Sequence, residues 1–139
     1  MTKAIESALA HTSLFSQCSP RELRLIAKVA KTRKVPNGTR LLVEGEVGDQ
    51  MLVVLSGSAS VQRGGRKIAS LAPGDVVGEL GVLSRAPRNA TVTTTSDSEV
   101  AIIGQRSMHR LLADAPGFAR KLLEALADRV RELDRKLFP

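Results

Sequence analysis

Short stretches with alternating apolar and polar residues fill the middle of the chain, and helical spacing of apolar residues is confined to its two ends. Turn signals rich in glycine, proline, asparagine or aspartate recur between residues 36 and 98. Frequent turns between segments that contain β-branched residues are typical of antiparallel sheets. The candidate strands are residues 40–43, 51–55, 59–63, 67–71, 90–95 and 99–103. We therefore predict a mainly β domain with flanking helices, whose strands close into an eight-stranded jelly-roll barrel over residues 35–104.

One turn signal also specifies its hairpin. Gly64-Gly65 is a two-residue connection of the kind that joins tightly paired antiparallel strands. It predicts a hairpin over residues 58–71 with a basic tip in water.

The segment before the strands is predicted to be helical. Ser19-Pro20-Arg21-Glu22 matches a capping box with proline at the first helical position, and apolar residues follow at helical spacing. We expect N-terminal helices over residues 1–34. Cys18 lies directly before the capping box, so we expect it to pack against Leu23 rather than to act as a reactive thiol.

Helical spacing returns after the last strand. Pro116 divides this region, which predicts a pair of C-terminal helices over residues 106–138. The long second helix is predicted to carry one apolar face: Phe118, Leu122, Leu123, Leu126, Val130, Leu133 and Leu137. Together with the barrel, these helices predict a single domain over residues 1–139.

Composition excludes several classes of protein. The chain has 139 residues, 42% of them hydrophobic, which suits one domain with its own core. A single cysteine excludes an internal disulfide, and no apolar run approaches the roughly 20 residues that span a bilayer. Without a secretory signal at the N-terminus, a cytoplasmic location is expected. The net charge of +7 comes from scattered residues, and Trp and Tyr are absent, so we expect no direct nucleic-acid binding.

The most informative stretch is a glycine-punctuated segment that returns through Pro87-Arg88. Gly78 to Leu83 would form a short helix or turn whose glycines expose backbone amides, and such amides favour an anion. Arg88 can hold two phosphate oxygens in a bidentate fork. The carboxylate of Glu79 would repel a neighbouring anion unless it accepted a hydrogen bond from a neutral group of the ligand. A ribose hydroxyl is such a donor. The alternative is a structural turn in which Glu79 and Arg88 pair with each other.

This stretch resembles the phosphate-binding cassette of the cyclic nucleotide-binding domain family. Residues 78–83 and 87–92 carry the resemblance, and Glu44-Gly45-Glu46-Val47-Gly48-Asp49 and Pro73-Gly74-Asp75 extend it in the family's order. The family implies a ligand, cAMP or else cGMP, and a cassette over residues 78–92 that includes a short helix.

The resemblance also implies a role for each site residue. Glu79 would hold the ribose 2′-hydroxyl and Arg88 the cyclic phosphate. The amides of Gly78, Leu80, Gly81, Asn89 and Ala90 would complete these contacts. Val61 and Leu71 match positions that form an apolar wall for the base. Asp128-Arg129 resembles the Asp-Arg of nucleotide-gated channels, whose arginine reaches the base. Asn89 stands where the family has Thr in guanine binders, so cAMP is expected over cGMP.

Enzymatic alternatives find little support. A cupin-type metal enzyme needs histidines lining the barrel, whereas His11 and His109 fall outside the predicted strands. Glu44, Glu46 and Asp49 do not have calcium-loop spacing, and no hydrolytic motif is present. No cofactor and no enzyme activity are therefore expected.

A regulatory sensor fits better, with a cassette and a C-terminal helix that move on binding. The apolar positions Leu126, Val130, Leu133 and Leu137 would face a partner domain or a second copy. The alternative is the effector domain of a DNA-binding transcription regulator, which needs a helix-turn-helix motif that does not occur before Pro139.

Overall fold

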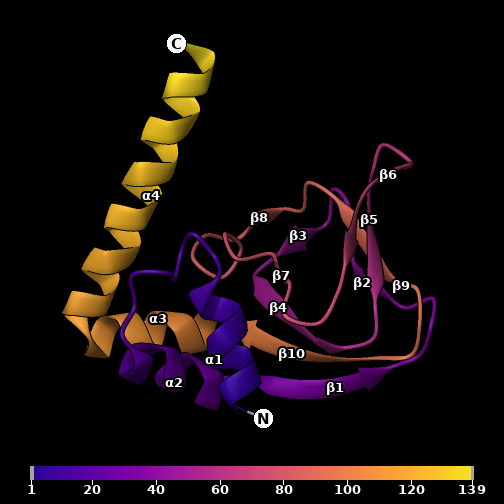
Figure 1. Ribbon diagram of the computed structural model, residues 1–139, viewed down its shortest axis with the longest axis horizontal. Coiled ribbons are helices and arrows are strands. Elements are labelled where there is room, and N and C mark those ends of the chain that lie inside the picture. The colour runs from indigo at the N-terminus through magenta and orange to yellow at the C-terminus, as the bar shows by residue number, and fades with distance from the viewer. Residues whose placement is uncertain (1, 139) are drawn as a thin grey trace.

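The computed structural model describes residues 2–138 of the chain, which form ten strands and four helices (Figure 1). Met1 and Pro139, included in the predicted domain, lie outside the described residues. In chain order the elements are α1 (Thr2–Ala10), α2 (Pro20–Val29), β1 (Lys31–Val35), β2 (Arg40–Leu42), β3 (Val47–Gly48), β4 (Gln50–Ser56), β5 (Ala59–Arg63), β6 (Arg66–Leu71), β7 (Val76–Val77), β8 (Ala86–Pro87), β9 (Thr91–Thr94), β10 (Ser98–Gly104), α3 (Gln105–Asp114) and α4 (Pro116–Leu137).

The strands form two four-stranded sheets and a small two-stranded one. Their orders are β1-β10-β4-β7, β2-β9-β5-β6 and β3-β8, with every pair antiparallel. The predicted closed eight-stranded barrel is wrong, because the strands pair within each sheet and leave sheet edges at β1, β7, β2 and β6. The chain is nevertheless mainly β with flanking helices.

The N-terminal helices end earlier than predicted. Residues 31–34, expected to be helical, belong to the edge strand β1, which pairs with β10 from Lys31 opposite Ile102 to Val35 opposite Ser98. The apolar spacing that defines α2 stops at Ala27, and the following polar residues gain backbone hydrogen bonds by joining the sheet.

Two local predictions are confirmed. Strands β5 and β6 form the predicted hairpin, and Gly64 and Gly65 take φ values of +59° and +77°, as its two-residue turn requires. Ser19 caps α2: its hydroxyl accepts from Glu22 N at 3.2 Å, and Ser19 N donates to Glu22 Oε1 at 2.8 Å.

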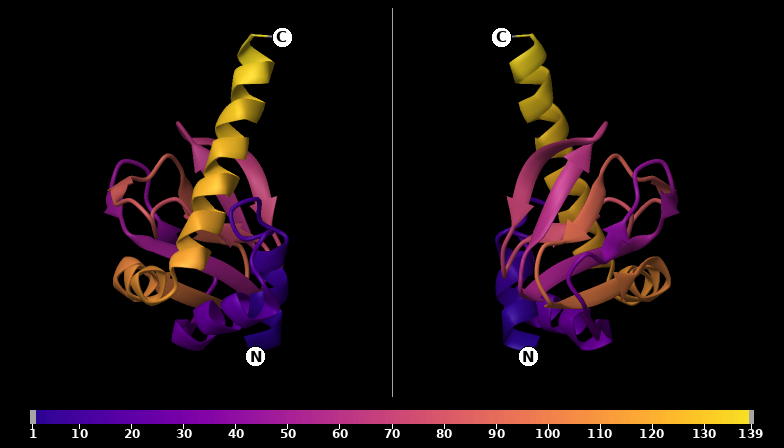
Figure 2. Two further views of the ribbon diagram at one scale, coloured as in Figure 1. Left: turned by 90° about the vertical axis from the view of Figure 1, so that its left-hand side faces the viewer. Right: turned by 90° about the vertical axis from the view of Figure 1, so that its right-hand side faces the viewer.

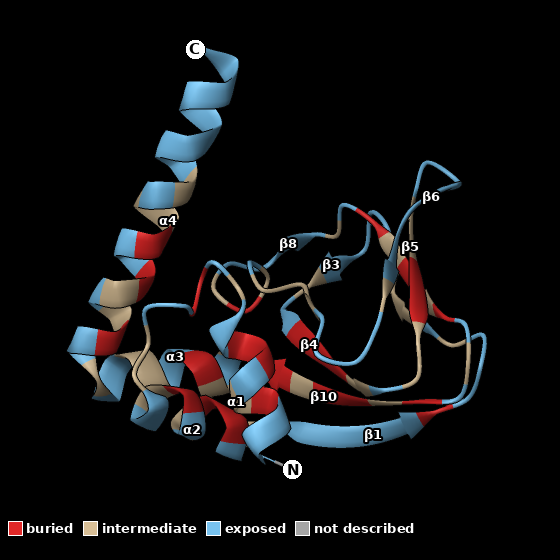
Figure 3. Cartoon of the chain, viewed as in Figure 1, coloured by how far each residue is buried: buried red, intermediate tan, exposed pale blue. Residues whose placement is uncertain are grey.

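The main core lies where the helices cover the sheet of β1, β10, β4 and β7 (Figure 3). Side chains from α1, α2, α3 and the start of α4 meet those of β4 and β10. The largest buried members are Phe15, Phe118, Ile5, Leu9, Leu14, Ile26, Met51, Ile103 and Met108. Cys18 packs against this cluster, and burial, followed by the neighbouring Glu22 carboxylate, raises the pKa of its thiol to about 11. The predicted packing role of Cys18 is therefore confirmed.

Helix α4 carries two apolar stripes rather than the single face predicted. Phe118, Leu122 and Ala125 are buried against the body, whereas Leu123, Val130, Leu133 and Leu137 are exposed. The C-terminal end of the helix extends beyond the rest of the molecule, as views from two opposite sides show (Figure 2). No helix among residues 2–138 is both long and apolar enough to cross a membrane.

Candidate functional site

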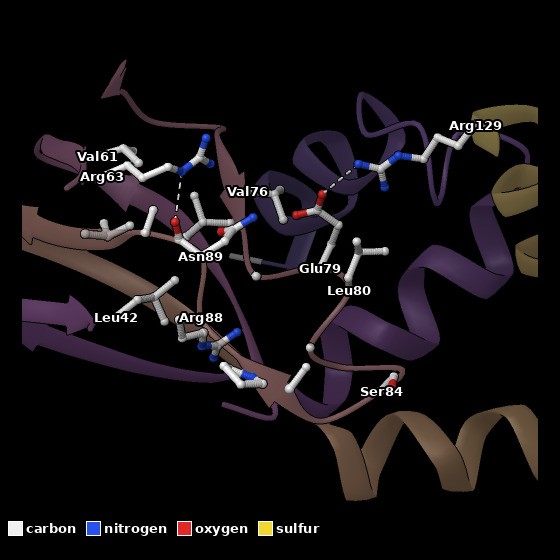
Figure 4. Close-up of a pocket in the computed structure, with 17 residues that line it drawn as sticks. Leu42, Val61, Arg63, Val76, Glu79, Leu80, Ser84, Arg88, Asn89 and Arg129 are labelled. Carbon is white, nitrogen blue, oxygen red and sulfur yellow. Dashed lines mark hydrogen bonds and ion pairs between the residues drawn. The ribbon is translucent and has the colours of Figure 1, made fainter. Parts of the chain in front are cut away.

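A pocket of about 390 Å³ lies between the segment 78–90, strands β2, β5 and β9, and helix α4 (Figure 4). It brings together nine of the ten predicted site residues: Val61, Gly78, Glu79, Leu80, Gly81, Arg88, Asn89, Ala90 and Arg129. Residues as distant in sequence as Val61 and Arg129 therefore line one cavity.

Leu71 is the predicted site residue that the pocket does not include. It pairs with Ala59 at the end of β6, an edge strand whose preceding residues 66–70 are all exposed. The apolar wall is instead a cross-strand row, in which Val92 lies opposite both Leu42 and Val61. Leu42 and Val92 were missed because their register with Val61 depends on strand pairings between distant segments.

The segment 79–84 forms hydrogen-bonded turns and not the short cassette helix that we expected. Gly81 N donates to Gly78 O at 3.0 Å, and Ser84 N donates to Leu80 O at 3.0 Å. Glycines at both positions 78 and 81 weaken any helix here. The amide of Gly81 is thus already engaged, which corrects its predicted role as a free ligand donor.

Arg88 lies in a cradle made by three glycines, Gly48, Gly78 and Gly81. A methyl group added to Gly78 or Gly81 would come within 2.8 or 2.7 Å of Arg88 Nη1, and one added to Gly48 would overlap Nε and Cζ. The side chain of Arg88 also donates from Nη2 to the carbonyl of Gln50 at 2.7 Å. Gly48 belongs to the glycine-containing acidic turn at residues 44–49, which is recognisable in the sequence, but its contact with Arg88 was not foreseen.

Two backbone hydrogen bonds hold the main chain of Arg88 in place. Arg88 N donates to Glu46 O at 2.8 Å, and Gly45 N donates to Arg88 O at 2.8 Å. The pairing of β8 with β3 places Pro87 opposite Val47 just before it. The turn at residues 44–49 therefore holds the backbone of Arg88 in place.

The charge of Arg88 has no counterion in a direct ion pair within residues 2–138. Burial lowers the pKa of the Arg88 guanidinium below its ordinary value, and the nearby Asp49 carboxylate opposes this shift. A half-buried cation with spare donors on a pocket wall is a site for an anion, and its planar fork suits phosphate oxygens.

Glu79 pairs with Arg129 on α4, at 3.5 Å between Oε1 and Nη2 (Figure 4). The alternative in which Glu79 pairs with Arg88 is not found in the described chain. Arg129 Nη1 is buried and makes no hydrogen bond within that same part of the chain. A buried donor without an acceptor is costly, by about 1–3 kcal/mol, so an acceptor brought into the pocket would be favoured here.

The hairpin closes one side of the pocket. Arg63 Nε donates to the Asn89 carbonyl at 2.9 Å, and Glu44 Oε1 accepts from Gly64 N at 3.0 Å. These two contacts tie the β5–β6 tip to the residues around Arg88. Arg63 was missed as a lining residue because its side chain looked like part of a solvated basic tip.

The two histidines lie apart from the pocket. His11 Nδ1 is 2.7 Å from Ser7 O, and His109 Nε2 is 3.2 Å from Leu83 O. Within residues 2–138, no three His, Cys, Asp or Glu side chains are grouped so as to hold a metal ion.

Comparison with known proteins relates the whole arrangement to one family model and to several proteins. The model, described as cyclic nucleotide-binding domain, matches residues 32–115. The cAMP-dependent protein kinase regulatory subunit of Hypocrea atroviridis is 34% identical over 116 residues, which are 84% of this chain and 25% of that protein. The CRP-like cAMP-activated global transcriptional regulator of Mycobacterium tuberculosis is 26% identical over 138 residues, 96% of this chain and 62% of that one.

A solved structure is similar over nearly the whole chain. The N-terminal domain of a transcriptional regulator from Streptomyces coelicolor A3(2) superimposes with a TM-score of 0.85 at 26% identity, and 94% of each chain is covered. The chain spans less than two thirds of the length of both curated relatives named above.

Proposed function

The chain belongs to the cyclic nucleotide-binding domain family, and from this premise we propose that its pocket binds a 3′,5′-cyclic nucleotide, with cAMP preferred. The observation that carries the proposal is Arg88, a guanidinium without an ion-pair partner in the described chain, held by its glycine cradle in the wall of a 390 Å³ pocket. An anion of the size of a cyclic phosphate would supply the missing charge.

The sugar and phosphate would be held by the cassette. Arg88 takes the phosphate oxygens, and the amides of Gly78, Leu80, Asn89 and Ala90, which make no backbone hydrogen bond within residues 2–138, add further donors. Glu79 accepts from the ribose 2′-hydroxyl, the only hydroxyl that a 3′,5′-cyclic nucleotide leaves free on its sugar. To do so it exchanges an ion pair of 3.5 Å for a shorter hydrogen bond.

The base would lie against the row formed by Leu42, Val92 and Val61, with Arg129 at its edge. The Nη1 atom of Arg129, which makes no hydrogen bond in the described chain, has a natural acceptor in a purine ring nitrogen. Asn89 occupies the position after the arginine at which family members that bind guanine have Thr. We therefore expect cAMP to bind more tightly than cGMP.

The proposed output is regulation rather than turnover. Residues from both the cassette and α4 line the pocket, so a ligand that contacts both can favour one arrangement of the helix over another. The cassette and α4 are therefore the proposed moving parts, in the cytoplasm, with a partner domain or a second copy on the exposed stripe of α4. The similarity to the Streptomyces coelicolor domain favours a second candidate, the effector domain of a DNA-binding transcription regulator.

Calorimetric titration tests the proposal. We expect cAMP to bind with micromolar or tighter affinity, cGMP more weakly, and 5′-AMP very weakly because its phosphate is not held in the cyclic geometry beside Arg88. Chromatography of the same samples, with divalent metal added, should recover cAMP unchanged. No heat with either cyclic nucleotide would refute the function, and AMP in molar excess over protein would refute a pure sensor.

A further inference from the structure

Basic residues that are scattered along the sequence come together where α2, α3 and β1 lie, on the lower side of the molecule in Figure 1. Helices α2 and α3 contact each other, and β1 follows α2 after one residue. Lys31, the first residue of β1, lies opposite Ile102, three residues before α3 begins. We define the basic face by seven exposed residues of these elements: Arg21, Arg24, Lys28, Lys31, Arg33, Arg106 and Arg110. Lys34, further along β1, is left out because it lies opposite Glu99.

Both helices turn their basic residues away from the core. The buried residues of α2 are Leu23, Ile26 and Ala27. At about 100° per residue, the three basic-face residues of α2 fall on the opposite side of the helix. In α3 the buried residue is Met108, and the two basic-face arginines lie two residues before and two residues after it, about 160° away around the helix. The basic face is therefore the outer surface of a packed helical layer.

The charge of the basic face is not neutralised from within the chain. None of its seven residues has an ion-pair partner among residues 2–138. The carboxylate of α2, Glu22, is taken instead by Lys121 at 2.7 Å. The exposed large apolar side chains of the same part of the chain lie elsewhere, on β3, β6, the cassette, α4 and the residue after it. The basic face thus combines a high positive charge with the lack of an apolar centre.

This combination specifies the kind of partner. A specific protein interface obtains most of its binding energy from apolar and aromatic residues at its centre, which the basic face does not offer. A bilayer with anionic lipids attracts lysine and arginine by charge alone, and each residue near its surface strengthens binding by about fivefold. The basic face extends along β1 and also across the neighbouring helices α2 and α3 (Figures 1 and 2). A surface that is broad in two directions suits a planar layer of charge better than a rod-shaped nucleic-acid duplex.

We infer that the basic face docks this chain on the surface of a membrane that contains anionic lipids. None of the seven residues lines the pocket, and the projecting end of α4 points away from the basic face (Figure 1). A docked chain therefore keeps both its pocket and the end of α4 open to solvent. The docking rests on charge and exposure, and does not depend on the proposed function.

Co-sedimentation with lipid vesicles tests the docking. We expect the chain to bind vesicles that mix phosphatidylcholine with phosphatidylserine, and not vesicles of phosphatidylcholine alone. Raising the salt concentration from about 0.1 M to about 1 M shortens the Debye length from about 10 Å to about 3 Å and should release the chain. The double variant Arg24→Glu, Arg106→Glu should bind at least about 25-fold more weakly, from about fivefold for each positive charge removed. The matched control Arg66→Glu, Arg135→Glu changes two exposed arginines outside the basic face and should bind nearly as wild type does.

Three results would overturn the docking. The first is a chain that stays in solution with phosphatidylserine vesicles at low salt. The second is an equal loss in both double variants, which would show that net charge and not the basic face matters. The third is tighter binding to duplex DNA than to the vesicles at equal phosphate concentration, which would make nucleic acid the partner. Calorimetry separates this proposal from the proposed function, because Arg24→Glu, Arg106→Glu should bind cAMP as wild type does, and failure to bind cAMP would leave the vesicle result standing.

Discussion

Replacing Arg88 with leucine should weaken cAMP binding by more than about tenfold, and by up to roughly a hundredfold. The substitution removes the one half-buried cation of the pocket that has no ion-pair partner within residues 2–138, together with its bidentate geometry. Calorimetry measures the loss, and circular dichroism should show an unchanged fold because the guanidinium makes a single hydrogen bond to the protein, with Gln50 O.

Arg85→Leu is the matched control, because Arg85 is exposed in the same segment and does not line the pocket. It removes one positive charge close to Arg88 in the chain, so any loss of affinity caused by net charge alone would appear in both variants. Arg88→Lys should fall between wild type and Arg88→Leu, since an ammonium keeps the charge but not the fork. Wild-type affinity in Arg88→Leu would show that the cassette has been assigned wrongly.

Gly48→Ala should reduce cAMP affinity by a similar factor, although Gly48 itself does not line the pocket. The added methyl group would overlap Nε and Cζ of Arg88, and the flexible end of that side chain is what can move. The backbone of Gly48 does not have a positive φ, so alanine is tolerated there. We therefore expect about a tenfold loss of affinity or more, as for a misplaced charge-assisted contact, with the melting temperature little changed.

Gly117→Ala provides the comparison, because a methyl group there meets no atom within 4 Å. It should leave cAMP affinity unchanged and, as a Gly to Ala change in a helix, should not lower stability. If Gly48→Ala bound cAMP as wild type does while Arg88→Leu did not, the cradle would not be what positions Arg88. Equal losses in both glycine variants would point to a general loss of stability.

Local chemistry was predictable from the sequence wherever neighbouring residues decide the structure. The capping box at Ser19, the hairpin turn at Gly64-Gly65 and the break at Pro116 each depend on a few adjacent residues, and all three are found. Nine of the ten predicted site residues also line the pocket. Seven of them lie between residues 78 and 90, adjacent in one cassette, whereas Val61 and Arg129 were placed by the family resemblance alone.

Arrangements that depend on distant segments could not be predicted in this way. Leu71 was wrongly assigned to the pocket wall because its position is set by the pairing of β6 with β5, where it lies opposite Ala59. The predicted closed barrel was wrong because the periodicity of a strand does not show which other strand it pairs with. The contacts of Gly48 with Arg88 and of Glu79 with Arg129 cross 40 and 50 residues of chain. Helix α4 showed one apolar pattern in sequence, and only packing divides it into a buried stripe and an exposed one.

Amide hydrogen exchange with and without cAMP tests most directly whether this pocket is the nucleotide site and whether the site reports to α4. We predict slower exchange in residues 78–92, where cassette amides meet the phosphate, and in residues 129–133, with the buried strands β4 and β10 little changed. Protection of the cassette alone would make α4 a passive lid. If saturating cAMP left residues 78–92 unchanged, the ligand would bind elsewhere or not at all, and the account given for Arg88 and Glu79 would be contradicted.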